Sequence, residues 1–246
     1  MSVKPAKVRE PLALLKSLIA LLLIAICIWA AQWQFQRGID RHQRNSLIES
    51  QLTLPEINIS KIASANTSDI TAFEWRTVSA AGQFNPAQQI LLKNRYFEGV
   101  YGYEVLTRFK LSDGRYIWVD RGWVKAGADA KTAPVTTTVP SGEVSLVARV
   151  RLDRSLPVGA FFALPYSGVG MISKLNAQTG FKSEGFYLDL ISGSDSSLTP
   201  AVAAQVPELS DGPHLAYSLQ WIFFAGLIVY GRILIRRGQI LTRKEL

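Results

Sequence analysis

The sequence has few of the residues that build disulfide bonds and metal sites. Among its 246 residues are one cysteine, Cys27, and two histidines, His42 and His214. A single cysteine excludes an intrachain disulfide framework and a cysteine-cluster metal site, and two histidines exclude a zinc site built from several imidazoles. The chain also lacks the phosphate-binding loop, the dinucleotide fingerprint, the nucleophile elbow and the zinc-protease helix motif. We therefore do not expect an enzyme.

Long apolar runs are present near both ends of the chain. Residues 17–35 contain no charged side chain, and as a helix they would span roughly 29 Å, close to the hydrocarbon thickness of a bilayer. A second run covers residues 214–235 and follows Asp211-Gly212-Pro213, which favours a helix start. We predict two transmembrane helices. The alternative for the first run is a cleaved signal peptide, but bulky side chains follow it where a cleavage site needs small ones.

The net charge of +8 is concentrated at the two ends of the chain. Residues 1–16 carry +3 and residues 232–246 carry +4, whereas residues 36–213 carry only +1. Basic flanks stay on the cytoplasmic side of a membrane. The expected layout is a cytoplasmic tail (1–16), a first span (17–35), a periplasmic domain (36–213), a second span (214–235) and a cytoplasmic tail (236–246). This distribution does not indicate a nucleic-acid partner.

The expected location is the bacterial cytoplasmic (inner) membrane. The basic flank before the first span is too short for a mitochondrial transit peptide, which would be amphipathic and rich in arginine and serine. The lipid bilayer is accordingly an expected partner.

The segment between the spans has the pattern of a small, mainly antiparallel β domain (α+β), a barrel or a sandwich. Asp113-Gly114 between two strand-like runs is the strongest hairpin signal. Helical pattern is restricted to 36–52 and about 169–179, and polar, aperiodic loops are expected over 124–141 and 192–212. The strand-like runs are 89–92, 101–109, 116–119, 144–147 and 186–190.

Several polar side chains lie at the outer ends of both predicted spans. Placing polar side chains in a bilayer costs free energy, so they are expected to have a role there. On a helix, His214, Tyr217, Ser218 and Trp221 share one face. One interpretation is an interfacial belt, because Trp and Tyr lie at headgroup level. The other is that His214 is a haem-iron ligand, with Trp221 flanking the macrocycle.

Several other side chains were considered as candidates for a functional role. Arg37 and Arg41 are expected at the same membrane face as His214, where they either bind haem propionates as bidentate donors or extend to lipid phosphates. His42 is interpreted as a surface histidine, and Cys27 as inert in the middle of the membrane. The carboxylates Glu104, Asp113 and Asp120 are interpreted as solvated strand faces and turn caps, not as a catalytic pair.

Four ordered blocks of the sequence carry a resemblance to a known family. It resembles the Surfeit locus protein 1 family, the assembly factors of haem–copper cytochrome oxidases, and the match covers about residues 29–225. No block is decisive alone, but the ordered set is specific. The blocks are WQFQR at 33–37, GQF at 82–84 with LKNR at 92–95, GYEVLT at 102–107 with DGR at 113–115 and VDRGWV at 119–124, and DGPHLAYSLQW at 211–221.

The resemblance implies a role in oxidase biogenesis, namely help in placing haem into the catalytic subunit. It implies haem as the cofactor, with haem a among the candidates, and as partners the oxidase catalytic subunit and haem-synthesis or other assembly proteins. The implied iron contact is His214. The expected haem-binding set is His214, Tyr217, Trp221, Trp33 and Arg37.

Two arginines in the second and third blocks are expected to matter for partners. Arg95 and Arg121 are expected to orient the domain or to bind a partner, and the alternative is that they belong to a salt-bridged strand face. The competing functions are a haem-holding assembly chaperone, a scaffold that binds the nascent oxidase subunit without cofactor, and a membrane-anchored enzyme. The enzyme would need a titratable cluster in a pocket of the central domain, and the sequence alone identifies none.

Overall fold

A computed structural model describes residues 11–62, 70–128, 132–152 and 170–241. The chain forms two compact units. The helix unit consists of residues 1–46 and 209–246, and the barrel unit consists of residues 47–208. The expected tails, 1–16 and 236–246, lie partly outside the described residues.

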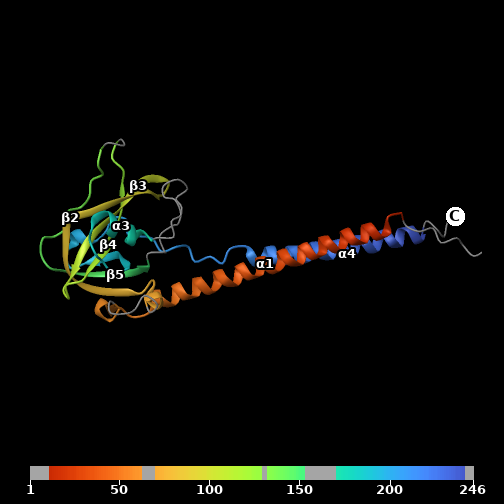
Figure 1. Cartoon of the computed structure of the whole chain (residues 1–246), viewed down its shortest axis with the longest axis horizontal. Helices are drawn as coiled ribbons and strands as arrows, with labels where there is room; N and C mark the ends of the chain where they lie inside the picture. The colour runs from red at the N-terminus through yellow and green to blue at the C-terminus, as the bar shows by residue number, and fades with distance from the viewer. Residues whose placement is uncertain (1–10, 63–69, 129–131, 153–169, 242–246) are drawn as a thin grey trace, which may run out of the picture. The chain divides into compact units, whose positions relative to one another are not determined.

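Two long helices form the helix unit. Helix α1 covers Ala13–Thr53 and helix α4 covers His214–Leu241, and both are long and apolar enough to cross a membrane. They run antiparallel and side by side (Figure 1). The helix expected over 36–52 is present, as an uninterrupted continuation of the first apolar run. The boundary placed at residue 36 therefore does not correspond to a break in the helix.

The two helices pack along a seam of mostly small side chains. The shielded positions of α1 recur at alternating spacings of four and three, as in a coiled coil. Small residues let the two backbones approach closely. The Ser218 hydroxyl donates a hydrogen bond to the Ala31 carbonyl at 2.9 Å. The seam contains Ala13, Ser17, Ala20, Ile24, Cys27, Ala31, Gln34 and Gly38 of α1 and His214, Ser218, Trp221, Ala225, Ile228 and Arg232 of α4.

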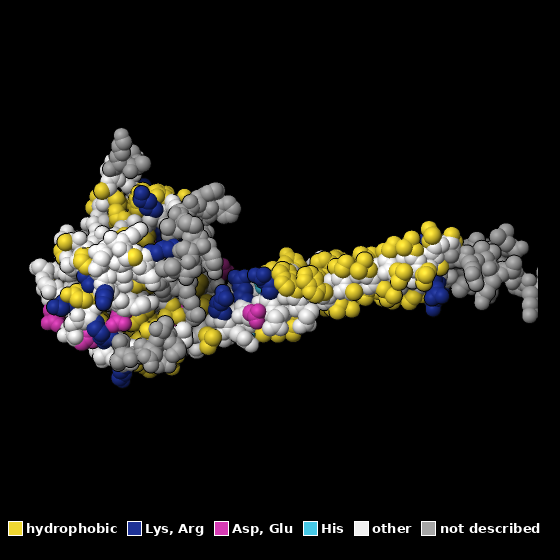
Figure 2. Space-filling model, in the orientation of Figure 1, with side chains coloured by type: hydrophobic (Ala, Val, Ile, Leu, Met, Phe, Trp, Pro, Cys, Tyr) yellow, Lys and Arg dark blue, Asp and Glu magenta, His cyan; other side chains and the backbone are white. Residues whose placement is uncertain are grey.

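The outward faces of these helices are apolar. Figure 2 shows hydrophobic side chains over most of the visible face where α1 and α4 run side by side, with Lys and Arg near the two ends of this stretch. A continuous exposed apolar surface of this kind indicates contact with lipid or with another protein. Exposed side chains on it include Leu18, Ile19, Leu22, Ile28, Leu219, Phe223, Val229 and Tyr230.

The barrel unit is a closed β-barrel, so the barrel alternative is confirmed over the sandwich. The strands are β1 (Ile57–Asn58), β2 (Thr77–Phe97), β3 (Val100–Leu111), β4 (Tyr116–Lys125), β5 (Val144–Leu152) and β6 (Phe186–Gly193). Their order is β1-β2-β3-β4-β6-β5, and β2 also pairs with β5, which closes the ring. All five expected strands are present, and most pairs are antiparallel. The β1–β2 and β4–β6 pairs are parallel.

Strand β2 differs most from its prediction. It begins at Thr77, not at residue 89, because Thr77 to Gly82 pair with β5, and the pairing with β3 begins at Gly82. Irregularities between Asn85 and Gln89 and between Leu92 and Arg95 interrupt the pairing of β2 with β3 and let the strand bend. The expected loops are also shorter, since β4 reaches Lys125 and β6 reaches Gly193. Residues 129–131 of the first loop lie outside the described residues.

Two apolar layers hold the barrel together. The interior is filled by alternating side chains such as Phe84, Phe109, Ile117 and Leu188. On the outer face, helix α3 (Met171–Thr179) packs Ile172 and Leu175 against Leu106, Trp118 and Tyr187. This helix matches the one expected at about 169–179, of which residue 169 lies outside the described residues.

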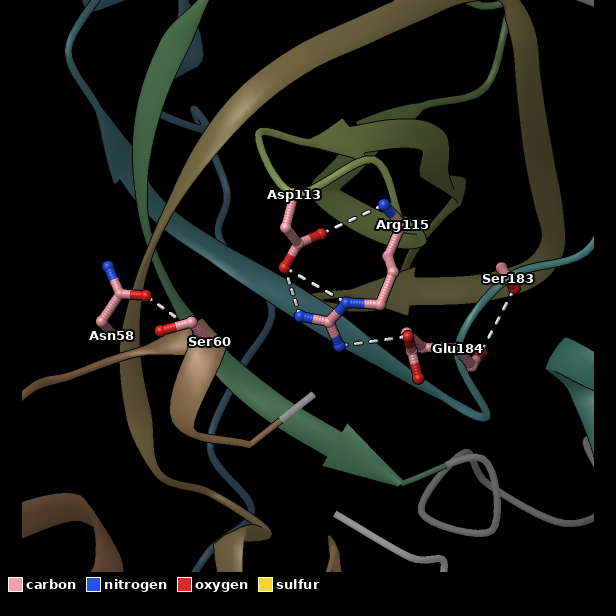
Figure 3. Close-up of polar contacts among 6 residues, drawn as sticks. All are labelled: Asn58, Ser60, Asp113, Arg115, Ser183 and Glu184. Carbon is pink, nitrogen blue, oxygen red and sulfur yellow. Dashed lines mark hydrogen bonds and ion pairs between the residues drawn. The ribbon is translucent and has the colours of Figure 1, made fainter. Parts of the chain in front are cut away.

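The expected Asp113-Gly114 hairpin joins β3 to β4. Gly114 has a φ of +89°, which glycine adopts without strain. Asp113 accepts hydrogen bonds from the backbone N–H and the side chain of Arg115, and Arg115 also contacts Glu184 at 3.2 Å (Figure 3). The hydrogen bond from Arg115 lowers the pKa of the Asp113 carboxyl below its ordinary value. The turn-cap interpretation of Asp113 is confirmed. Asn58 similarly accepts from the Ser60 N–H at 2.9 Å.

Candidate functional site

His214 lies at the start of α4, on the seam between the two helices. Its Nδ1 atom is 2.9 Å from Oε1 of Gln34 on α1. As a hydrogen-bond acceptor, the Gln34 carbonyl oxygen fixes the proton on Nδ1 and sets the orientation of the ring. Nε2 is then the nitrogen with a lone pair, the form in which imidazole binds iron. The geometry fits a ligand role for His214.

A second polar contact joins the same ends of the two helices. The Asp211 carboxylate, three residues before His214, is 2.8 Å from Nδ1 of His42 and 2.9 Å from Nδ2 of Asn45. These hydrogen bonds lower the pKa of Asp211. Both partners are largely exposed, so the contact sets geometry more than it stabilises. It confirms His42 as a surface histidine and shows that Asp211 ties α4 to α1.

The other expected haem-binding side chains surround this end of the helix unit without forming one cluster. Tyr217 and Trp33 are 46% and 47% exposed. The Arg37 guanidinium lies 5.2 Å from the centre of the Trp33 ring, and Trp221 packs edge-to-face on Phe224. Of these four, only Trp221 lies on the seam with His214. The other three stand beside it, where they are accessible to a bound molecule.

Sequence reasoning did not identify Gln34 as the partner of His214. A signal was available, because Gln34 occupies a seam position in a helix otherwise rich in apolar side chains. A polar group at such a position needs a hydrogen-bonding partner. Its counterpart had to come from the start of α4, where His214 is the first residue.

The structure places both expected partner-binding arginines in internal contacts of the barrel. Arg95 Nε is 2.7 Å from Oε2 of Glu104. Arg121 is 9% exposed and donates to Oε1 of Gln89 and to the Thr137 carbonyl. Both side chains therefore fix the positions of neighbouring strands and of the segment that contains Thr137.

Asp120 is not on a solvated strand face, so that interpretation was wrong. It is 2% exposed and is the register partner of Asp189 across the parallel β4–β6 pair. Burial raises the pKa of Asp120 well above its ordinary value, and the carboxylates of Glu104 and Asp189 raise it further. The three carboxyl groups line one cavity of the barrel unit. The titratable cluster that the sequence did not identify is therefore present.

The raised pKa of Asp120 predicts a pH-dependent stability with a definite sign. The folded state binds the Asp120 proton more tightly than the unfolded state, whose carboxyl pKa is about 3.9. The stabilisation is complete below that value and is lost as the pH rises through the folded pKa, by at most about 1.4 kcal/mol per pH unit. Unfolding midpoints across pH should therefore show wild type losing stability relative to Asp120→Asn as pH increases.

Asp113→Asn provides the control with the opposite sign. Because Arg115 lowers the pKa of Asp113, its contribution is present above the unfolded pKa and is lost as the pH falls. Parallel pH curves for wild type and Asp120→Asn would contradict the assignment of a raised pKa to Asp120.

The fold defines a class of protein in which a small closed barrel follows one long apolar helix in the sequence and precedes a second one. The sequence matches the SURF1 family over residues 21–226, and the chain belongs to this family. It is 29% identical over 221 residues to uncharacterized SURF1-like proteins of Mycobacterium bovis and Mycobacterium tuberculosis, covering 85% of this chain and 80% of each relative. A SURF1-like protein of Rickettsia felis is 25% identical over 239 residues, or 91% of this chain and 98% of the relative.

Proposed function

We propose that this protein is an assembly factor for a haem–copper cytochrome c oxidase, and that it holds haem as cargo for the catalytic subunit. Family membership and the resemblance to oxidase assembly factors support the role in assembly. The observation that carries the haem proposal is the His214–Gln34 contact, because it presents an oriented imidazole at one end of the helix unit. Further partners in the proposal are haem-synthesis or other assembly proteins.

The side chains near His214 have the chemistry that haem requires. Trp221, Tyr217 and Trp33 offer aromatic faces for the macrocycle, and Arg37 offers a guanidinium for a propionate. Iron coordination by His214 would anchor the cargo. Haem a is the candidate for an oxidase of this class.

We also propose that α1 and α4 cross the bacterial inner membrane, with both termini cytoplasmic and the barrel unit periplasmic. The basic flanks and the exposed apolar faces support this topology. Arg232, within the proposed second span, donates hydrogen bonds to the Ala13 carbonyl and to the Ser17 hydroxyl at 3.1 and 2.9 Å. Its charge is thus directed at the neighbouring helix, as expected for an arginine within a membrane span.

The haem proposal predicts a spectroscopic result. The full chain, purified in detergent from cells that make the oxidase haem, should show a Soret band. His214→Ala should lose most of this haem. The other histidine, His42, contacts Asp211 and is largely exposed, so it does not replace the imidazole on the seam. Gln34→Leu should weaken haem affinity by about 10–100-fold, the range found when a group that orients a ligand is removed. The measurement is haem per chain from the visible spectrum.

His42→Ala is the matched control, because it removes the other histidine at the same end of the helix unit. It should retain the wild-type haem content. Equal haem in wild type and His214→Ala would contradict the ligand assignment. Co-purification of the oxidase subunit with a haem-free chain would instead favour the scaffold function.

A further inference from the structure

The barrel unit contains a cavity at the point where two parallel strands separate. Strands β4 and β6 pair from Trp118 and Tyr187 to Asp120 and Asp189 and then diverge. The cavity has a volume of about 360 Å³, and the segment from Ala204 to Glu208 forms one of its walls. The size suits a small organic group.

Of the three strand carboxyl groups that line this cavity, two form ion pairs with arginines and the third, that of Asp120, does not. Asp189 is 2.6 Å from Nη1 of Arg151, and Glu104 is paired with Arg95. Asp120 forms no such ion pair among the described residues, where Arg95 attracts it without direct contact. Its one hydrogen bond there comes from the Gly122 N–H, which donates to Oδ1 at 2.8 Å. Its side chain is almost completely buried and lines the cavity. The second carboxyl oxygen of Asp120 is therefore left for a group inside the cavity.

The guanidinium of Arg151 lines the same cavity and is held there by a carboxylate and an aromatic ring. Arg151 pairs with the Asp189 carboxylate, stacks 3.7 Å from the centre of the Trp75 ring and lies 5.9 Å from that of Tyr187. Trp75 has a φ of +72°, an unfavourable conformation for a tryptophan, and this places its ring at the cavity wall. Carboxylates combined with aromatic faces are the chemistry that binds organic cations.

We infer that this cavity binds an organic cation, a guanidinium or ammonium group, with Asp120 as its counter-charge. Glu208 adds a further carboxylate at the wall formed by 204–208. A bare metal ion fits less well. In the described ranges no three His, Cys, Asp or Glu side chains have an arrangement that could hold one, and this includes the carboxyl groups of the cavity. The cation comes either from a free small molecule or from a basic side chain of a partner polypeptide.

The test compares arginine with its neutral isostere on the full chain in detergent. N-acetyl-arginine amide should bind saturably by isothermal titration, whereas N-acetyl-citrulline amide, which has nearly the same shape without the charge, should bind at least about tenfold more weakly. Asp120→Asn should weaken the binding of the arginine probe by a similar factor. Asp113→Asn removes a carboxylate that does not line the cavity and should leave binding unchanged.

A second comparison distinguishes the two sources of the cation. Tighter binding of the arginine probe than of propylguanidine would assign the site to a polypeptide side chain, and the reverse order would assign it to a free small cation. Glu208→Gln changes an exposed side chain and should cause a smaller loss of binding in a folded protein. Equal binding of the arginine and citrulline probes, or no saturable binding of either, would overturn the inference, and this comparison needs only the wild-type chain.

Discussion

Replacing Arg151 with methionine is expected to lower the free energy of unfolding by about 3–5 kcal/mol. Arg151 and Asp189 form an ion pair with side chains only 10% and 2% exposed. Removing the guanidinium leaves the Asp189 carboxylate buried beside Asp120, without its principal counter-charge. For a chain of this size, the loss corresponds to a decrease in Tm of about 6–20 °C. The change is measurable by tryptophan fluorescence of the full chain in detergent.

Arg115→Met is the matched control for the loss of an arginine ion pair. Arg115 contacts Asp113 and Glu184, but its side chain is 29% exposed and water replaces much of the interaction. We expect a loss of about 0–1 kcal/mol. Equal decreases in Tm for the two variants would show that burial does not distinguish the two ion pairs.

Replacing Gly122 with alanine is expected to destabilise the barrel unit by about 2–5 kcal/mol. Gly122 has a φ of +90°, which costs an L-residue about 1–2 kcal/mol. A Cβ atom at this position would also lie 2.3 Å from the Val202 carbonyl oxygen, which accepts a hydrogen bond from the Trp123 N–H. The segment that contains Val202 would have to move, and such overpacking adds about 1–3 kcal/mol. Thermal unfolding measures the total.

Gly114→Ala separates the two contributions. Gly114 has nearly the same φ, +89°, but a Cβ atom there meets nothing within 4 Å. This variant should show only the cost of the backbone conformation. If Gly122→Ala is as stable as Gly114→Ala, the segment that contains Val202 moves away from the new Cβ atom at no measurable cost in free energy.

The local signals of the β domain were sufficient to predict part of each of the strands β2 to β6, because turn residues and alternating side chains are encoded within a few positions. The two-residue strand β1 and the first part of β2 were not predicted. Asp113-Gly114 is an example, since the hairpin forms where the dipeptide stands. The closure of the ring was not predictable in this way. It depends on Thr77 to Gly82 pairing with residues of β5 that are distant in sequence. The first irregularity of β2 lies at Asn85-Pro86, where the Ala87 N–H donates to the Asn85 side chain, but this local signal does not indicate which strands β2 joins.

The candidate sites show the same limit. His214 was recognisable from its position at the start of an apolar helix, but its partner Gln34 lies at the other end of the chain. Asp189 is part of the apolar run 186–190, and a carboxylate inside such a run indicates burial with a partner. Its contact with Arg151, and the pairing of Asp120 with Asp189, depend on the register of three strands. No spacing in the sequence encodes that register.

The double pairing of β2 has a consequence for biosynthesis. Because β2 must join β5, and β5 must join β6, the ring is complete only after Gly193 has become available. In the proposed topology these strands emerge from the translocation machinery one after another, with α4 still to follow. The hairpin of β2 and β3 would then have unpaired strand edges until β4 and β5 have emerged. Periplasmic chaperones that shield strand edges are accordingly expected to influence the yield of this protein more than its stability once folded.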